Sequence, residues 1–516
     1  MKYIKRNKIQ ILVFLIYVLS RLPNLGCDCF NTDVWKWKAR SYDFGTGVFT
    51  LDFEKTIQKY HPGVTLMWIG SIAVKFNNLF PAQDTLQSIF QLHFIQKLLL
   101  TLVIGFCMSV IYRLLSKIID SEYAFISVIL LIFEPFFIGL TRVFHLEGLL
   151  SVFMLISILY LYLNNILFAG VFAGLSILTK TSALYLLPFF ALAVFMRTKS
   201  GKETFIRFLK FFGITLVTMF VLWPILWIKP IYVFSTLYRG ISVIGIEREH
   251  VQYYFGKLVE DPGVSYYPVV LFLRSSLWLI AGLGGLILGR KYVLKNKKHN
   301  NFIGYLSIYS LFYVIELGIP SKKLDRYVLP ALVPLVLISS FWVKAILQKV
   351  KKRYLKGVIF AAPILLTAFY LHPDYLSYYN PISGGLRTGI NILEPKWMIG
   401  EKQIISYFEN IKKEEGYIDI YESDSMEELI QSNEVENVLT VGFPEKYYTQ
   451  IWPFLRKINS WAVIKDLTPF AVHTKYFIYP VWADDSVQDD RLKLVFKDQI
   501  KIRGVPVYNV YKNSQE

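Results

Sequence analysis

The sequence predicts an all-α polytopic membrane bundle followed by a small extracytoplasmic α/β domain at the C-terminus. Hydrophobic residues make up 54% of the 516 residues and charged residues only 18%, which is too little polar surface for a soluble protein of this length. Apolar runs of about 15 to 23 residues, the length that crosses a hydrocarbon layer, recur along the first three quarters of the chain. After about residue 372, charged residues return and the apolar runs shorten to the length of strands.

About eleven apolar segments are candidate transmembrane helices, and together they form a predicted membrane domain over residues 1–372. The first follows a basic N-terminus like that of a signal peptide, but it is long for one and no small-residue cleavage site follows it. We therefore expect it to be retained. The two segments between residues 166 and 196 are short enough to form one re-entrant pair instead. The segments are 9–25, 93–112, 123–141, 148–163, 166–179, 182–196, 208–228, 268–289, 302–319, 327–345 and 357–371.

Basic residues are concentrated in alternate loops, and this distribution predicts the orientation of the chain. Residues 197–210, 290–298 and 344–353 hold many of the lysines and arginines, as cytoplasmic loops do. The net charge of +18 is therefore a topology signal and not the footprint of a nucleic-acid partner. The prediction is a multi-pass plasma-membrane protein with a cytoplasmic N-terminus. The segments left outside are 26–92, 142–147, 229–267, 320–326 and the tail.

The tail, residues 373–516, has the alternating composition of a small α/β domain. Ser425 and Glu428 have the spacing of a capping box, which begins a helix. Helical patterns near 401–413 and 444–458 lie between segments that alternate as strands do. These predicted strands are Tyr417–Tyr421, Asn437–Gly442, Tyr476–Tyr479 and Val505–Tyr511.

The first outer segment is too long for a simple connector and holds the first candidate for catalysis. Asp33 follows the first span by a few residues, so it is expected at the membrane surface. A carboxylate there can take a proton from an attacking hydroxyl group. The alternative is that Asp33 is an ordinary solvated loop residue. Farther along, the amphipathic stretch 64–80 suits the membrane interface.

The turn 142–147 places three ionisable residues between two apolar segments. Charged groups at such depth are costly and tend to mark a site or a pathway. Arg142 is a candidate for holding a phosphate, and Glu147 is a candidate second acid or, with His145, a metal ligand. The alternative is a short polar turn closed by an Arg142–Glu147 pair.

The outer segment 229–267 contains a histidine beside two glutamates. This residue, His250, is a candidate metal ligand or proton carrier, although a single histidine is more often neither. Lys180, between two short spans, either meets a phosphate or extends to the membrane interface.

The turn 320–327 carries a basic cluster on the outer side, against the positive-inside trend. Lys322, Lys323 and Arg326 form it. The phosphate of a lipid carrier would explain this cluster, because lysine and arginine both bind phosphate well. Local pairing with Asp325 is the alternative.

Six stretches of the sequence resemble, in the same order, the class C glycosyltransferases. The similarity is to the bacterial branch of the protein O-mannosyltransferase and aminoarabinose-transferase superfamily. It spans residues 30 to about 400. The stretches are Tyr60–Gly70 (YHPGVTLMWIG), Arg142–Leu150 (RVFHLEGLL), Gly174–Lys180 (GLSILTK), Asp261–Arg274 (DPGVSYYPVVLFLR), Lys322–Pro334 (KKLDRYVLPALVP) and Tyr375–Gly385 (YLSYYNPISGG).

The resemblance implies the class C glycosyltransferase fold, which is a helical membrane bundle with catalytic outer loops. It also implies a donor sugar carried on a polyprenyl phosphate. By this resemblance Asp33 is the catalytic base and Glu147 is a second acidic residue of the site. The basic residues of the 322–326 turn would hold the donor phosphate, together with Arg142.

The resemblance also assigns residues around the substrate. Tyr60 and His61 begin the first matching stretch and Tyr327 lies in the fifth, so all three are expected in substrate loops. His250 falls where some relatives carry a metal-binding histidine. No cofactor is required by the sequence, although a divalent metal is compatible with it.

The sequence departs from the family pattern at two places. Relatives often have an acidic pair in the first outer loop, whereas Val34 follows Asp33 here. Their tight Trp-Gly-Glu-Gly motif is spread out here as Trp397 and Gly400–Glu401. The second departure puts the role of the tail in doubt more than the first affects Asp33.

The sequence thus predicts an integral membrane glycosyltransferase that acts by inverting displacement with Asp33 as base. The acceptor, on the outer face of the membrane, is a protein, a lipid or a glycan. The competing hypothesis is a transporter or flippase of a lipid-linked sugar, which predicts ionisable residues near the bilayer midplane and paired broken helices. A structural subunit of an envelope complex would leave the outer basic cluster unexplained.

Overall fold

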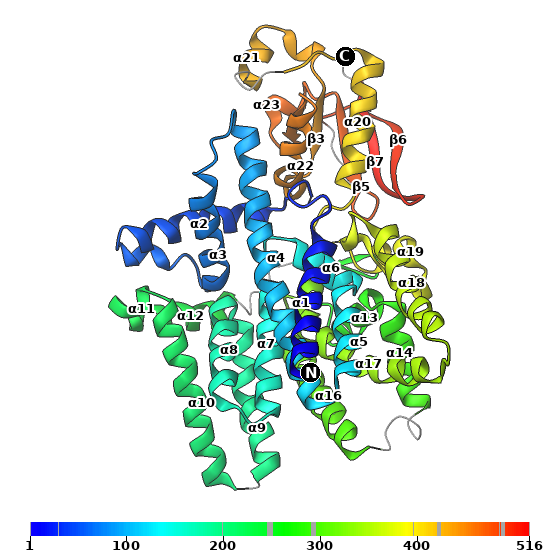
Figure 1. The fold of residues 1–516 in the computed structure, drawn as a ribbon. Coiled ribbons are helices and arrows are strands. Elements are labelled where there is room, and N and C mark those ends of the chain that lie inside the picture. The colour runs from blue at the N-terminus through cyan, green and yellow to red at the C-terminus, as the bar shows by residue number, and fades with distance from the viewer. Residues whose placement is uncertain are drawn as a thin grey trace.

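The computed structural model describes residues 2–28, 30–198, 200–244, 251–289, 296–395, 397–420, 425–484, 486 and 491–514. Most of the described chain is helical, and a five-stranded sheet lies at one end of the molecule (Figure 1). The N-terminal helix runs within the helical part, whereas the chain ends beside the sheet.

The segment 26–92, which the sequence predicts to be the first outer segment, is largely helical. It follows α1 (Lys2–Arg21) and contains α2 (Thr32–Phe49), the short η1 (Phe53–Thr56), α3 (Val64–Asn77) and the first turns of α4 (Thr85–Ile118). Asn31 caps α2, because its side chain accepts a hydrogen bond from Val34 N at 2.9 Å. Helices α2 and α3 pack together, and Ser71 Oγ donates to Ser41 O across their contact at 2.6 Å. The segment is therefore a folded unit that holds the start of α2 in place.

The rest of the helical part consists of two groups of helices joined by an irregular connection. The first group is α5 (Ser121–Ile132), α6 (Pro135–Arg142), α7 (Leu146–Tyr162), α8 (Ile166–Thr179), η2 (Thr181–Tyr185), α9 (Leu186–Thr198) and α10 (Gly201–Leu222). The connection is α11 (Ile225–Ile228), α12 (Pro230–Arg239), the π-helical turn η3 (Gly240–Ile244) and the hairpin β1 (Gln252–Tyr254) and β2 (Lys257–Val259). The second group is α13 (Tyr266–Arg274), α14 (Leu277–Leu288), α16 (Lys297–Gly318), η4 (Asp325–Val328), α17 (Leu329–Lys349) and α18 (Arg353–Leu371).

By length and composition, five of the described helical segments can cross a membrane. They are Thr85–Ile118, Thr181–Thr198, Gly201–Leu222, Asp325–Lys349 and Arg353–Leu371, and the number reaches seven if each of two bent helix pairs is one span. The prediction of about eleven spans is higher than this measure supports. The predicted segments do coincide with helices, but 148–163 and 166–179 lie in helices of only 17 and 14 residues. A full crossing takes about 20 residues.

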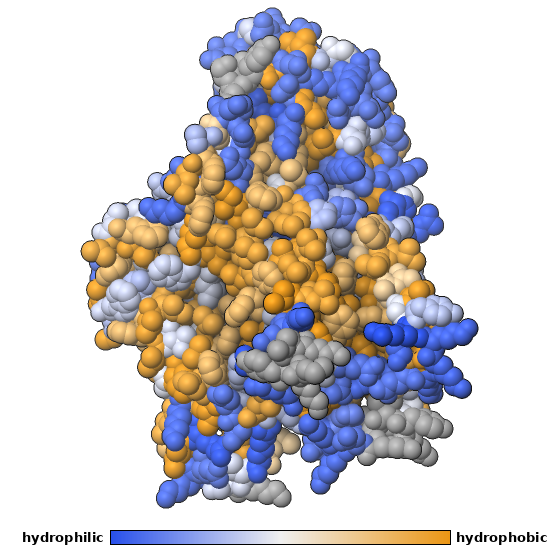
Figure 2. Space-filling model, viewed as in Figure 1, coloured by the Kyte–Doolittle hydropathy of each residue, from blue (hydrophilic) through white to orange (hydrophobic). Residues whose placement is uncertain are grey.

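Hydrophobic residues gather over the middle of the molecule, with hydrophilic residues at its lower end and around the C-terminal sheet (Figure 2). On α18 the side chains of Leu366, Phe369 and Tyr370 are 69%, 78% and 66% exposed. Exposed apolar surface on this scale is unfavourable in water and favourable in lipid. Together with the apolar helices, it makes the chain a multi-pass membrane protein.

Two of the helical segments are broken, and a hydrogen-bonded link joins the two breaks. Helices α5 and α6 meet at 63°, and α13 and α14 meet at 111°. Pro135 begins α6 and cannot donate a backbone hydrogen bond into the preceding turn. Glu134, at the first break, accepts hydrogen bonds from Ser276 N at 2.8 Å and Ser276 Oγ at 2.5 Å at the second. This link fixes the direction of α6, whose end leads into the turn that carries Glu147.

The tail forms a mixed sheet in the order β4-β3-β5-β7-β6. Strands β4, β3 and β5 are parallel, and β7 pairs antiparallel with both β5 and β6. Parallel neighbours need a crossover, which α22 supplies between β3 and β4. The elements are η5 (Tyr375–Ser377), η6 (Pro381–Ser383), α19 (Gly385–Ile392), α20 (Glu401–Glu415), α21 (Met426–Gln431), η7 (Glu434–Asn437), β3 (Thr440–Phe443), α22 (Glu445–Lys457), β4 (Trp461–Ile464), α23 (Thr468–Ala471), β5 (Tyr476–Pro480), β6 (Leu494–Ile502) and β7 (Val505–Asn513).

The α/β character predicted for the tail is confirmed, with differences in individual strands. Three predicted strands coincide with β3, β5 and β7, and the Ser425–Glu428 capping box is formed at the start of α21. The predicted strand at 417–421 is wrong for its described residues, where Ile418 makes a single bridge to Val438. Strand β6 was not predicted because it is an edge strand with a mostly exposed, polar middle, so it lacks the alternation of a half-buried strand. Strand β4 was also missed.

The tail contacts the first outer segment directly. Thr32 Oγ1 and Thr449 Oγ1 share a hydrogen bond of 2.7 Å, and Trp35 Nε1 donates to Thr449 O at 2.7 Å. The Trp35 ring stacks on Trp452 with a centroid distance of 5.6 Å. The first turn of α2, which contains Asp33, is therefore held between the tail and the helical part.

Candidate functional site

Asp33, Glu147 and Arg326 lie together, although they are far apart in the sequence. Arg326 Nη2 donates to Asp33 Oδ2 at 3.1 Å, and Arg326 Nε lies 3.3 Å from Glu147 Oε1. The three residues come from the first turn of α2, the first turn of α7 and η4. One guanidinium group thus joins both acids.

Glu147 is buried among cationic and imidazole nitrogens. Lys180 Nζ donates to Glu147 Oε1 at 3.0 Å, and His145 Nδ1 contacts Glu147 Oε2. On its other side, His145 Nε2 lies 3.7 Å from Asp33 Oδ2. The Glu147 side chain is only 1% exposed, whereas that of Asp33 is 29% exposed. Of the two acids, Asp33 is the one that a substrate can reach, and Glu147 positions the groups around it.

Lys180 is fixed by the segment that contains the first family-like stretch. Gly63 N donates to Thr179 O at 3.2 Å, directly before Lys180 at the end of α8. Gly63 has a φ of +60°, and a Cβ on it would lie 2.1 Å from the Trp37 ring. No residue with a side chain fits this position without moving α2. The glycine therefore allows α2, α3 and α8 to meet at the cluster.

Two aromatic rings cover the cations of the cluster. The Arg326 guanidinium lies 4.8 Å from the Trp397 ring, and Lys180 Nζ lies 3.6 Å from the Tyr327 ring. His145 and Trp397 pack edge to face at 5.3 Å. Ring faces attract cations and exclude water. Because Trp397 belongs to the tail, the tail forms one wall of the cluster, which the spread-out motif had left in doubt.

Asp33 is ionised at neutral pH. Burial raises its pKa, but the charge of Arg326, followed by that of His145, lowers it more, so the pKa of Asp33 lies below its ordinary value. Its place in the first turn of α2 acts in the same direction, because a helix N-terminus favours negative charge. Asp33 is therefore a partly exposed carboxylate in the form that accepts a proton.

His61 and Tyr60 approach the cluster from the same segment as Gly63. Burial, followed by the charge of Lys180, lowers the pKa of His61 to about 3, so its ring is neutral at neutral pH. Its Nδ1 is buried and makes no hydrogen bond to any described residue. The Tyr60 ring packs on the His61 ring at 4.3 Å. The pair presents a neutral hydrogen-bonding group beside the charged cluster.

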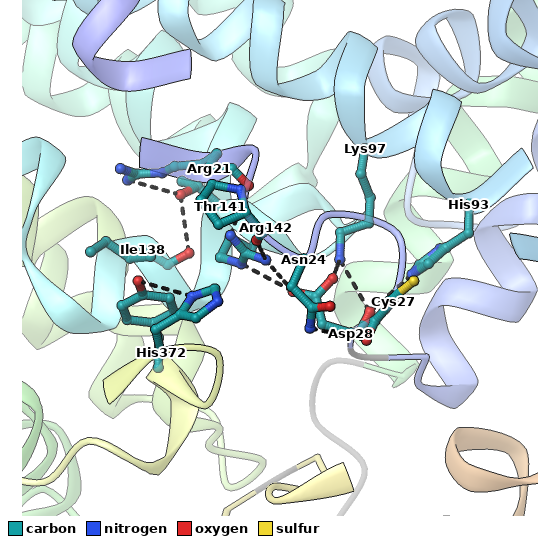
Figure 3. A network of polar contacts seen from close by, with 12 residues as sticks. Arg21, Asn24, Cys27, Asp28, His93, Lys97, Ile138, Thr141, Arg142 and His372 are labelled. Carbon is teal, nitrogen blue, oxygen red and sulfur yellow. Dashed lines mark hydrogen bonds and ion pairs between the residues drawn. The ribbon is translucent and has the colours of Figure 1, made fainter. Parts of the chain in front are cut away.

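Arg142 belongs to a second cluster and not to the first. Its Nε and Nη2 donate to Asp28 Oδ2 at 3.0 Å and 2.8 Å, and its Nη1 donates to Arg21 O at 2.8 Å. Lys97 Nζ contacts the other carboxylate oxygen of Asp28, so both cations converge on one acid (Figure 3). His93 Nε2 lies 3.0 Å from Asp28 O. Arg142 therefore ties the end of α6 to the chain after α1.

A cavity of about 440 Å³ lies beside this second cluster. Asp28 and Arg142 line it on one side, and His372 at the end of α18 lines it on the other together with Asp374 and Glu401 from the tail. Asp33 is not among its lining residues. The cavity thus lies between the helical part and the tail, next to the Asp33 cluster.

The basic residues of the turn 322–326 have different surroundings: one holds the chain together, and the others face the Asp33 cluster or are partly exposed. Lys323 Nζ donates to Asp261 Oδ1 at 2.6 Å and to Pro320 O at 2.7 Å, which holds the connection before α13. Lys322 is partly exposed and lies close enough to His61 to influence its pKa. Arg326 is the residue of this turn that reaches Asp33. Its Nη1 is buried and makes no hydrogen bond to any described residue.

The described residues contain no group of side chains suited to binding a metal ion. No three of its His, Cys, Asp and Glu side chains are grouped so as to hold a metal ion. Asp33 and Glu147 face Arg326 and Lys180 instead, which already compensate their charge. His250, the predicted metal ligand, lies outside the described residues.

Several members of the cluster received no firm role from the sequence. Lys180 stands at the end of an apolar helix, where a lysine that extends to the interface looks the same in sequence. Trp37 and Arg40 follow Asp33 at spacings of four and seven residues, and the Arg40 guanidinium lies 4.6 Å from the Trp37 ring. That helical spacing is the signal that would have linked them to Asp33.

Comparisons with known proteins concern mainly the fold. No protein-family model matches the sequence, and no curated protein matches it significantly. Among solved structures, ArnT from Cupriavidus metallidurans bound to undecaprenyl phosphate is 11% identical, with 97% of each chain covered and a TM-score of 0.51. The archaeal oligosaccharyltransferase AglB from Archaeoglobus fulgidus, in complex with an inhibitory peptide and a dolichol-phosphate, is 12% identical. That match covers 100% of this chain and 75% of AglB, with a TM-score of 0.46.

The likeness to ArnT extends over the helical part and the tail, because nearly the whole of both chains is covered. At 11% identity, this likeness concerns the fold, and the AglB match adds no argument to it. It confirms the resemblance found in the sequence: the chain has the fold of the class C membrane glycosyltransferases.

Proposed function

We propose that the chain transfers a sugar from a polyprenyl-phosphate donor to an acceptor on the outer face of the membrane. The observation that carries this proposal is the contact between Asp33 and Arg326. It places an ionised, partly exposed carboxylate against a buried guanidinium whose Nη1 has no partner among the described residues. A general base and a binding group for an anionic leaving group therefore stand side by side.

The chemistry that fits this pair is a single inverting displacement. Asp33 accepts the proton of the acceptor hydroxyl as that oxygen forms a bond to the sugar C1. The bond between C1 and the phosphate oxygen breaks, and its electron pair leaves with the polyprenyl phosphate. Arg326 compensates the negative charge that develops on the phosphate, and Tyr327 and Trp397 keep water from the cations. A leaving group neutralised in this way needs no general acid.

The fold is compatible with such a donor. The ArnT structure that shares it contains undecaprenyl phosphate, which is a polyprenyl phosphate. His61 and Lys180 add a neutral and a charged donor around the same point, and the Tyr327 ring orients Lys180. The acceptor class, protein, lipid or glycan, follows from the assays below.

Transport of a lipid-linked sugar is the second candidate, and one observation favours it. The described part of the chain has two broken helical segments, α5–α6 and α13–α14, whose breaks are linked by the buried Glu134. Paired broken helices around an ionisable group are a feature of transporters. The transfer assay therefore includes a measurement of donor movement across the membrane.

Asp33→Asn tests the enzyme hypothesis and Asp43→Asn is its matched control. Asp43 lies on the same helix α2 and is exposed, so the same substitution there should leave activity unchanged. Purified protein is incubated with radiolabelled polyprenyl-phosphate sugars and separate protein, lipid and glycan acceptors. We expect Asp33→Asn to lower transfer by about 10²- to 10⁴-fold, the usual effect of losing a general base.

Two outcomes would contradict the proposal. Equal transfer by wild type and a folded Asp33→Asn variant would remove Asp33 from the mechanism. No transfer with any donor, combined with donor movement across proteoliposome membranes, would replace the transferase by a flippase.

The location of the site implies an orientation that we also propose. The N-terminus is cytoplasmic, and residues 373–516 form a domain outside the membrane that completes the site on residues 1–372. Cysteine labelling of intact cells tests it at Lys413→Cys, which is exposed on α20 of the tail, and at Lys349→Cys. Both variants are made in a chain whose three cysteines are replaced by alanine, because Cys27 is itself exposed. Labelling by a membrane-impermeant reagent should occur only in the tail variant, and the reverse pattern would invert the topology.

A further inference from the structure

An apolar groove of about 930 Å³ runs between two membrane helices on the side of the molecule where α18 and α19 lie. Leu277 and Ala281 of α14 form one wall, and Leu366 and Tyr370 of α18 form the other. All four side chains are exposed. The groove is therefore open to the medium that surrounds α14 and α18, which for these helices is lipid.

Positive groups gather where the groove meets the tail. Arg387 of α19 and Arg503, in the turn between β6 and β7, both line it. Arg387 is exposed, and its side chain makes no hydrogen bond or ion pair within the described chain. Arg503 donates to Ser377 Oγ at 2.5 Å and lies 5.2 Å from the Tyr370 ring, so it is held at the rim.

The first turn of α19 adds partial positive charge at this end of the groove. Gly384 and Gly385, which begin the helix, line the groove together with Leu386. No side chain caps α19, and the N–H of its first residue, Gly385, donates to Asn380 O at 3.1 Å. Two arginines and a helix N-terminus at one end of an apolar groove complement a group that is anionic at the head and apolar behind it.

The groove is separate from the Asp33 cluster. Between them stands Arg274, which is 2% exposed and pairs with Asp325 at 2.8 Å. Arg274 also donates to Leu376 O and Tyr378 O, which closes the layer behind the groove. None of the cluster residues Asp33, Glu147 or Arg326 lines the groove.

We propose that this groove binds an anionic phospholipid of the surrounding leaflet. Its phosphate group contacts Arg387, Arg503 and the first turn of α19, and one acyl chain lies between α14 and α18. The site is independent of the proposed transfer reaction, because it shares no residue with the Asp33 cluster. Bound there, the lipid links the tail turn at Arg503 to the two helices.

Native mass spectrometry of the delipidated full chain in detergent tests this site. The probes are dioleoyl-phosphatidylglycerol, which is anionic, and dioleoyl-phosphatidylcholine, which has no net charge. We expect wild type to retain the anionic lipid about ten times more strongly, and Arg387→Glu to abolish that preference. Lys257→Glu is the control, because Lys257 is exposed on β2, lies outside the groove and changes the net charge equally.

A second pair of variants tests the apolar wall. Leu366→Trp fills the groove and should lower the retention of both lipids, whereas Leu365→Trp changes the neighbouring residue, which is exposed but does not line the groove. Equal retention of the two lipids by wild type, or full retention of phosphatidylglycerol by Arg387→Glu, would overturn the proposal. Displacement of phosphatidylglycerol by an equimolar amount of undecaprenyl phosphate, lost in Arg387→Glu, would assign the groove to the carrier lipid instead.

Discussion

Asp33 is partly exposed and is paired with the buried Arg326, at the meeting point of α2, α7 and η4. Its ionised form is stabilised by Arg326 without being enclosed by it, since Arg326 uses one nitrogen on Asp33 and faces Glu147 with another. A fully enclosed carboxylate, such as Glu147, cannot reach a substrate. This difference in exposure supports Asp33, and not Glu147, as the base.

The pH dependence of transfer should reveal the effect of the Arg326 charge on the pKa of Asp33. Because the pKa of Asp33 lies below its ordinary value, the carboxylate stays ionised as the pH falls, and kcat/KM should stay constant down to acidic pH. In Arg326→Gln the main influence that lowers the pKa is lost. The acid limb of the kcat/KM profile should then move to higher pH. A limb that stays in place while activity falls would mean that Arg326 acts on the phosphate alone.

Glu147 should be more important for stability than Asp33. Glu147→Gln leaves Lys180 and Arg326 buried with less compensation, which should lower the free energy of unfolding by about 3 kcal/mol. Adding Lys180→Met should recover part of this loss, with a coupling energy of about 1–2 kcal/mol between the two sites. Thermal unfolding of the four proteins of this cycle measures it. Strictly additive effects would show that Lys180 and Glu147 do not interact.

At the scale of elements, the site depends on where helices begin and end. Asp33 is in the first turn of α2, Glu147 in the first turn of α7, and Lys180 directly after α8. Helix ends carry unpaired backbone groups and allow side chains to converge from different directions. The broken segment α5–α6 contributes as well, because its second helix ends at Arg142, directly before the turn that carries His145 and Glu147.

Gly63 offers a test of how closely these elements must meet. Gly63→Ala forces a Cβ to within 2.1 Å of the Trp37 ring, at a φ of +60° that side chains rarely adopt. We expect a loss of about 2–3 kcal/mol of stability and a larger relative loss of transfer, because α2 moves away from Lys180. Gly213→Ala is the control, since a Cβ there meets nothing within 4 Å and alanine favours the helix. Equal effects of both changes on transfer would show that the close contact is unimportant.

For the whole molecule, the contact between tail and helical part is as important as the bundle itself. Trp397 covers Arg326, and Thr449 and Trp452 hold the start of α2. The cavity between the two parts contains Glu401, whose pKa is raised to about 8 by burial and then by the charge of Asp374. Its protonated form therefore belongs to the folded state.

The stability of the tail contact should fall as the pH rises. A carboxyl group with a raised pKa in the folded protein contributes stability fully below its ordinary value of 4.5 and loses it as the pH rises to about 8. The decline can reach about 1.4 kcal/mol per pH unit for one proton. Glu401→Gln should flatten the dependence of Tm on pH between pH 5 and 8. A profile identical to that of wild type would mean that Glu401 ionises freely in the folded state.

The sequence by itself determined the features that depend on composition and on short spacings. Apolar runs located the helices, basic residues marked the loops, and the Ser425–Glu428 spacing located a helix start that the structure contains. Asp33 and Arg326 were recognisable because charged residues beside apolar segments are rare for an energetic reason. These signals depend on residues that are neighbours along the chain, so the sequence alone is enough to recognise them.

Only the tertiary structure decided which charged groups meet. Arg142 and Arg326 look alike in sequence, yet one is bound by Asp28 and the other reaches Asp33. Lys180 and Trp397 join the site because the end of α8 and the first part of the tail meet there, although they are more than 200 residues apart in the sequence. The pairing of buried charges depends on the packing of several helices at once, since each charge needs a partner in the folded state and the sequence offers several candidates for each.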